Sequence, residues 1–193
     1  MSIHSPVVRA MARITALIAA TSLAFASHAA QYDQLVVEDS AIEFNYTQMG
    51  VTLRGHFREF DGSLRFDPAA PESASAAIEV ELASIRTGLA EADAEVTGSS
   101  WLDTETYPRA RFESSAVRAL GDNRFEVTGT LDIKGTTQEI VVPAALVAAN
   151  GTAVFEGEFT IRRGDFAVGE GSWARFDVLA NEIRVQFRIT AGE

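Results

Sequence analysis

GVTLRGHFREFDGSLRF, residues 50–66, is the stretch that decides the fold. Its apolar residues occupy odd positions up to Phe57 and even positions from Phe60 onward. Each half alternates apolar with polar residues, which is the period of a β-strand with one dry and one wet face. The apolar positions change from odd to even numbers, and a strand can keep these side chains on its inward face across that change only if it has one extra residue. We therefore predict a β-bulge at Arg58 or Glu59. A strand bent in this way curls a sheet around an interior.

The same alternation recurs along the chain in short runs that turn residues separate. A single open sheet would leave its apolar face in water, so the sheet either closes into a barrel or folds into two stacked sheets. Gly55, Gly129 and Gly157 fall on the inward face and favour the barrel, because they allow sharp bends and leave volume inside. We predict one all-β domain at residues 30–193, an antiparallel eight-stranded β-barrel with one short helical segment at residues 91–96.

The first 29 residues have the pattern of a signal peptide. Arg9 and Arg13 precede an apolar run at residues 14–26, and small residues at 27 and 29 mark a cleavage site after Ala29. A membrane anchor is the alternative, but the run is shorter than the roughly 20 residues that span a bilayer. Translation from Met11 would shorten the segment. The pattern predicts export to the periplasm.

Charge and composition exclude several classes of function. The chain has a formal net charge of −11, which argues against nucleic acid and anionic lipid headgroups as partners. It has no cysteine, and after cleavage its one histidine is His56, so we predict no disulfide, no His/Cys metal site and no cofactor. His56 alternates with Phe57 and should face water. We therefore predict no catalytic residue.

An ordered set of motifs resembles the YceI-like family of secreted bacterial proteins and covers about residues 32–190. The motifs are Ser40-x-Ile42-x-Phe44, Gly55-x-Phe57-x-x-Phe60-x-Gly62-x-Leu64-x-Phe66, Ser84-Ile85-x-Thr87-Gly88, Trp101-Leu102-Asp103, Tyr107-Pro108-x-Ala110-x-Phe112-x-Ser114, Val127-x-Gly129-x-Leu131-x-Ile133-x-Gly135-x-Thr137 and Arg163-x-Asp165-Phe166. The resemblance implies a lipocalin-like barrel, exported to the periplasm, whose elongated apolar cavity binds polyisoprenoid chains, including isoprenoid quinone-like molecules. The chain departs from the family pattern at residues 90–96 and at Met49, where many members have Arg-Asp-Glu-His and a histidine.

Inward aromatic and apolar side chains are the candidate ligand-binding residues. The set is Phe44, Phe57, Phe66, Trp101, Phe112, Leu131, Phe159, Arg163, Trp173 and Phe187. Both tryptophans flank loop-like stretches, which places them near a barrel mouth or lid, or makes them plugs of a closed end. Arg163 has the inward parity of its strand and needs a carboxylate partner, for which Asp103 and Asp165 are candidates; contact with a ligand headgroup is the alternative.

Four functions remain open from the sequence. The first is a periplasmic carrier or sequestering protein for an apolar isoprenoid-type lipid. The second is an enzyme on a lipidic substrate that uses Arg163 and a carboxylate as an electrostatic pair. The third is a non-catalytic accessory module whose partner is a membrane redox protein. The fourth is an outer-membrane barrel with its apolar face in lipid. A homodimer is compatible with each of them.

Overall fold

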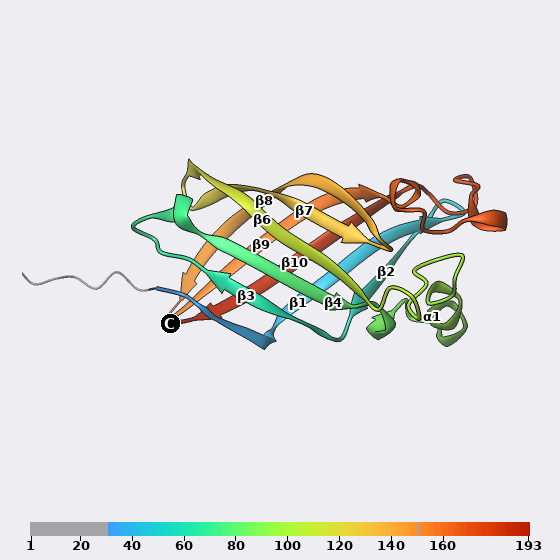
Figure 1. Ribbon diagram of the computed structural model, residues 1–193, viewed down its shortest axis with the longest axis horizontal. Coiled ribbons are helices and arrows are strands. Elements are labelled where there is room, and N and C mark those ends of the chain that lie inside the picture. Colours follow the sequence, from blue (N-terminus) through green and yellow to red (C-terminus); the bar gives the residue numbers. More distant parts are fainter. Residues whose placement is uncertain (1–30, 150) are drawn as a thin grey trace, which may run out of the picture.

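A computed structural model describes residues 31–149 and 151–193 (Figure 1). The predicted signal peptide, residues 1–29, lies outside the described residues. The elements are β1 (Gln34–Gln48), β2 (Val51–Phe57), β3 (Phe60–Arg65), the 3-10 helix η1 (Pro71–Ser73), β4 (Ser75–Glu81), the 3-10 helix η2 (Leu82–Ser84), β5 (Ile85–Arg86), α1 (Ala90–Val96), β6 (Arg109–Gly121), β7 (Arg124–Ile133), β8 (Thr136–Ala149), β9 (Thr152–Arg162), the 3-10 helices η3 (Arg163–Phe166) and η4 (Gly171–Trp173), and β10 (Glu182–Gly192). The fold is all-β, as predicted.

Residues 50–66 form β2 and β3, with a break at the predicted place. β2 ends at Phe57 and β3 begins at Phe60, so Arg58 and Glu59 form a two-residue interruption rather than a single-residue bulge. The backbone N–H groups of Arg58 and Glu59 donate to Ser84 Oγ at 3.2 and 3.0 Å. The buried Ser84 hydroxyl thus accepts hydrogen bonds from the two backbone N–H groups that have no strand partner at the break between β2 and β3.

The antiparallel sheet has the strand order β3-β4-β6-β7-β8-β9-β10-β1-β2-β5. β2 runs directly into β3, and β4 runs into β5 through η2, so the two ends of this order meet. Tyr32 and Phe66 exchange two backbone hydrogen bonds of 2.9 Å, which join the segment just before β1 to the residue that follows β3. The described part of the chain therefore has ten strands where eight are predicted, because two of the eight are each broken in two.

The two faces of the sheet differ as the alternation predicts. Apolar side chains of the described residues form two buried clusters inside the barrel. The outer face of β9 and β10 carries ion pairs between Arg188 and Glu156, and between Arg184 and Glu158 at 3.4 Å. His56 is exposed, as predicted. The stacked-sheet alternative is wrong, and the apolar clusters lie inside the barrel, on the side opposite to the one that the outer-membrane alternative requires.

One end of the barrel carries α1 and the loops that contain η3 and η4 (Figure 1). The helical segment predicted at residues 91–96 is α1. The backbone N–H groups of Gly169 and Glu170 donate to the Ser100 carbonyl at 2.9 and 2.8 Å, which ties the two loop regions together. No helix among the described residues is long and apolar enough to cross a membrane. We call this region the α1 end.

Candidate ligand-binding cavity

A cavity of about 590 Å³ occupies the interior of the barrel. Most of its lining is aliphatic or aromatic, and it is bordered by residues of both apolar clusters. Apart from the Tyr46 phenol, the lining residues with polar or charged side chains are Gln48, Arg65, Ser75, Thr87, Glu91, Glu95, Arg111 and Arg163. The volume lies within the range of about 300–1,000 Å³ that is usual for small-molecule sites.

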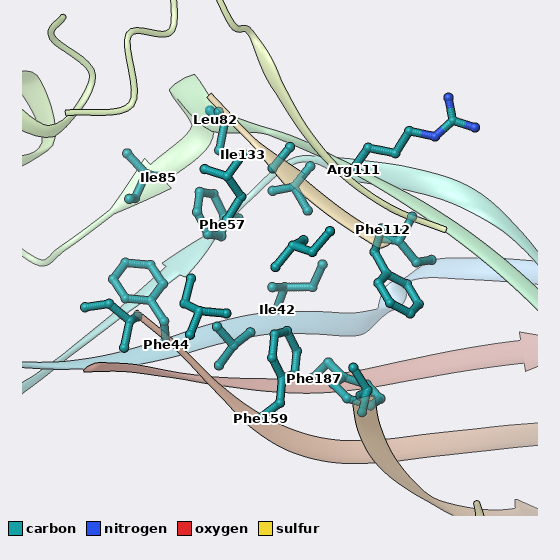
Figure 2. Close-up of a pocket in the computed structure, with 18 of the residues that line it drawn as sticks. Ile42, Phe44, Phe57, Leu82, Ile85, Arg111, Phe112, Ile133, Phe159 and Phe187 are labelled. Carbon is teal, nitrogen blue, oxygen red and sulfur yellow. The ribbon is translucent and has the colours of Figure 1, made fainter. Parts of the chain in front are cut away.

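The structure brings all ten predicted site residues together on the lining of this cavity. Figure 2 shows Phe44, Phe57, Phe112, Phe159 and Phe187 around one common space. They come from five different strands, β1, β2, β6, β9 and β10, so closure of the barrel assembles them. Their contact with a ligand stays a prediction.

Sequence reasoning missed several lining residues. Phe125 and Phe155 share the inward parity of Leu131 and Phe159 on β7 and β9, so the alternation that identified those residues could have identified these as well. Glu95 on α1 also borders the cavity, but no strand pattern covers a helix that lies at the end of a barrel. Side chains on such segments have no periodic signal in the sequence.

The three inward glycines do not leave empty volume, which corrects the sequence-based expectation. A Cβ added at Gly55 would lie 2.2 Å from Cζ of Phe44, and one at Gly157 would lie 2.4 Å from Cζ of Phe187. At Gly129 it would lie 2.7 Å from Cε2 and Cζ of Phe112. A phenyl ring from the neighbouring strand therefore occupies the place where each glycine lacks a side chain.

Three further phenylalanines pack against one another at the end of the barrel away from α1. Phe66 is 3% exposed, and its ring lies edge-on to those of Phe125 and Phe155, with centroid distances of 5.5 and 5.1 Å. Edge-to-face contacts of this kind are a favoured geometry for aromatic pairs. We call Phe66, Phe125 and Phe155 the phenylalanine cluster.

Arg163 is 2% exposed and makes no bond to a carboxylate. Its Nε donates to the Ala180 carbonyl at 3.2 Å, and its four remaining N–H groups donate to carbonyls at 2.8–3.0 Å. Those four acceptors are the carbonyls of Val168, Gly169, Trp173 and Leu179. The predicted partners Asp103 and Asp165 are wrong, because loop carbonyls take all five donors of the guanidinium.

This arrangement makes Arg163 an organiser of the loops at the α1 end. Burial lowers the pKa of the guanidinium from its ordinary value, but an arginine side chain stays charged at neutral pH. Its carbon Cζ lies 5.7 Å from the Trp101 ring centroid and 5.0 Å from that of Phe176. Because the electrostatic pair of Arg163 with a carboxylate is absent, the enzyme hypothesis loses the group on which it was based.

The two tryptophans meet at the α1 end, where a mouth or lid was predicted. Their ring centroids are 5.2 Å apart. Both indole N–H groups donate to Oε1 of Glu95, from Trp101 at 3.3 Å and from Trp173 at 2.9 Å. One carboxylate thus joins α1 to the loop before β6 and to η4.

The chemistry available in this cavity is mainly apolar burial. Within residues 31–149 and 151–193, no group of three or more His, Cys, Asp or Glu side chains could hold a metal ion. The described residues also leave no buried side-chain nitrogen or oxygen without a hydrogen bond. A ligand held here would gain its affinity from contact with aliphatic and aromatic walls.

Comparison with known proteins identifies the family. The model of the YceI-like domain matches residues 34–191. A UPF0312 protein of Pseudomonas syringae pv. tomato is 31% identical over 168 residues, which cover 80% of this chain and 86% of that protein. A UPF0312 protein of Azotobacter vinelandii is 29% identical over 165 residues, again covering 80% and 86%.

Solved structures of similar proteins support the same family. BcnA of Burkholderia cenocepacia has a TM-score of 0.80 and 34% identity, and the match covers 82% of this chain and 99% of BcnA. A polyisoprenoid-binding domain from Saccharophagus degradans has a TM-score of 0.68 with 16% identity, over 83% of this chain and 98% of that domain. The second likeness shows the fold alone. By the family model, its relatives and the architecture of the barrel, the chain belongs to the YceI-like domain family.

Proposed function

We propose that this protein binds a polyisoprenoid or isoprenoid quinone-like lipid in the cavity of its barrel, and that it carries or sequesters this lipid in the periplasm. The observation that carries the proposal is the cavity of about 590 Å³ with its mainly aliphatic and aromatic lining. The domain from Saccharophagus degradans, described as polyisoprenoid-binding, has the same fold and supports the proposal.

Burial energetics favour a long chain over a short one. Each buried methylene group contributes about 0.8 kcal/mol, so a chain of about ten carbons gains about 8 kcal/mol. Association costs about 4–15 kcal/mol before any net affinity remains. A ligand with few polar contacts must therefore bury a long hydrocarbon tail, which a polyisoprenoid provides.

The periplasmic part of the proposal is supported by the signal-peptide pattern of residues 1–29, in which Arg9 and Arg13 precede an apolar run. The absence of cysteine means that the exported chain needs no oxidising machinery to fold. Fractionation tests this part directly. The protein should appear in the periplasmic extract without detergent, and retention in the cytoplasm or in the membrane pellet would contradict it.

The binding part is tested with a series of prenyl alcohols of increasing length, from geraniol through farnesol to geranylgeraniol. Displacement of a fluorescent apolar probe measures the Kd of each alcohol. Because every added isoprene unit buries more hydrocarbon, we expect Kd to fall by about tenfold or more per unit until the cavity is full. Affinity that does not depend on chain length would contradict binding inside the barrel.

A matched pair of variants on β7 locates the site. Leu131 faces the cavity, whereas the adjacent Thr130 is exposed on the outer face. Leu131→Trp places a large ring in the lumen and should remove most geranylgeraniol binding, while Thr130→Trp should bind as the wild type does. Circular dichroism confirms that both variants are folded. Equal binding by the two variants would place the ligand elsewhere.

A further inference from the structure

Three glycine–phenylalanine pairs line the cavity, and they share one construction. Phe44 on β1 lies directly opposite Gly55 on β2, and Phe187 on β10 lies directly opposite Gly157 on β9. Phe112 on β6 is diagonal to Gly129 on β7, which lies opposite Ser114. These are the cross-strand positions whose side chains meet on one face of a sheet. We call the three pairs the ring seats.

In each ring seat the phenyl ring lies over the neighbouring strand instead of extending straight into the lumen. Ring atoms lie 2.2–2.7 Å from the position that a Cβ would occupy on the glycine. Carbon atoms pack best at about 3.5–4.0 Å, so no residue with a β-carbon could accept a ring in this position. The glycine therefore allows the ring to withdraw toward the wall.

The ring seats lie on opposite sides of the barrel. β1 and β10 are neighbours, and Ile42 pairs with Phe187 between them, so the Phe44 and Phe187 seats are close together around the wall. β6 and β7 lie across the barrel in the strand order, which sets the Phe112 seat against the other two. All three rings border the cavity, and Figure 2 shows them around its space. A ring that moved inward would narrow the part of the cavity that it borders.

We propose that the ring seats set the width of the cavity and thereby make it wide enough for a methyl-branched chain as well as for an unbranched one. This inference rests on the proposed function and adds the structural reason why a branched prenyl chain fits. Gly55, Gly129 and Gly157 act as positioning residues for the three rings. Aromatic side chains supply the apolar wall, and the glycines keep them out of the path of the ligand.

Gly55 offers the cleanest test of the three glycines. The added Cβ would also lie 2.7 Å from the carbonyl oxygen of Arg86, compared with 2.5 Å from that of Glu113 at Gly129 and 2.2 Å from that of Pro143 at Gly157. Gly55→Ala therefore disturbs the neighbouring backbone least. Gly192 on β10 supplies the matched control, because a Cβ there would meet only ordinary contacts of 3.9 Å and no ring.

The experiment compares two alcohols of the same main-chain length, the branched geranylgeraniol and the unbranched hexadecanol. Steric loss in an apolar pocket changes affinity by about 10-fold or more per methylene-sized group. Gly55→Ala should therefore weaken geranylgeraniol binding about tenfold and leave hexadecanol binding nearly unchanged. Gly192→Ala should affect neither alcohol. A crystal structure of the Gly55→Ala variant should show the Phe44 ring turned into the lumen.

A double variant distinguishes the effect of the displaced Phe44 ring from the effect of a clash with the neighbouring backbone. Adding Phe44→Leu to Gly55→Ala shortens the displaced side chain and should restore much of the geranylgeraniol binding. Equal loss for both alcohols, or no recovery in the double variant, would overturn the inference and assign the effect to the Arg86 carbonyl. If Gly55→Ala does not fold, Gly129→Ala with and without Phe112→Leu repeats the test. A wild-type protein that binds neither alcohol would instead overturn the proposed function, and this inference with it.

Discussion

The barrel uses phenylalanine in two ways, and the phenylalanine cluster and the ring seats show the difference. In the cluster, Phe66 contacts Phe125 and Phe155 edge-on and is almost completely buried. In the ring seats, each ring lies against a glycine and borders the open cavity. Both sets face inward with the same alternation. All six rings border the cavity, so the two sets differ in what the ring contacts, which is another phenylalanine in the cluster and a glycine of the neighbouring strand in the ring seats.

The largest effect should follow removal of a ring from the cluster. Phe66→Ala leaves a void between two rings that cannot close, and large-to-small changes at buried phenylalanines cost about 3–5 kcal/mol. Urea unfolding of the variant and the wild type measures this loss in the free energy of unfolding. Phe66 also borders the cavity, so geranylgeraniol binding by the folded variant should weaken as well. A loss as small as that of a surface substitution would contradict the packing role of the cluster.

Loss of the Arg163 guanidinium should be the next largest effect. Arg163→Met leaves five carbonyls without their donor, and each buried unsatisfied group costs about 1–3 kcal/mol, less where water can enter. We expect a net loss of about 2–3 kcal/mol by urea unfolding and faster amide exchange in residues 168–180. Arg175→Met is the control, because Arg175 is exposed and pairs with the nearby Asp177. Exchange that stays unchanged would refute the organising role of Arg163.

Removal of the Phe187 ring should affect stability less than removal of the Phe66 ring. Phe187 is half-buried because one side of its ring faces the cavity, so fewer contacts are lost. We expect Phe187→Ala to lower the free energy of unfolding by about 1–2 kcal/mol, near the centre of the range for point substitutions. Geranylgeraniol binding, in contrast, should weaken more than it does in Phe66→Ala. If Phe66→Ala had the larger effect on both unfolding and geranylgeraniol binding, the distinction between the phenylalanine cluster and the ring seats would be wrong.

The smallest effect concerns pH and Tyr46, which lines the cavity beside Phe44. Burial raises the pKa of the Tyr46 phenol above its ordinary value of 10.0. The folded protein then holds this proton more tightly than the unfolded chain does. Its contribution to stability is complete below pH 10 and is lost as the pH rises through the raised pKa. Unfolding free energies of Tyr46→Phe should fall less steeply above pH 10 than those of the wild type, and identical slopes would contradict a raised pKa of the Tyr46 phenol.

Much of the barrel could be predicted from the sequence, because strand alternation is a local signal. The parity change between Phe57 and Phe60 located the break in residues 50–66, and the inward parity of the strands identified the lining phenylalanines. The partner of each glycine could not be predicted in this way. It depends on the register between strands, and Phe112 reaches Gly129 diagonally rather than directly.

The α1 end was harder to predict for a different reason. The sequence suggested a carboxylate for Arg163, because opposite charges are the usual partners of a buried guanidinium. The structure uses carbonyls of residues 168–180 instead, and carbonyls are present in every residue and leave no pattern in the sequence. Glu95 also accepts hydrogen bonds from Trp101, six residues along the chain, and from Trp173, 78 residues away. The second contact depends on how the loops fold together, which no local sequence pattern indicates.

Native mass spectrometry of the protein, purified without detergent from the periplasm of its own host, tests the central claim most directly. The account predicts a bound species whose mass corresponds to a long-chain isoprenoid lipid and which disappears in Leu131→Trp but persists in Thr130→Trp. Protein that carries no lipid on isolation, and none after incubation with prenyl quinones, would show that the barrel is not a lipid-binding site.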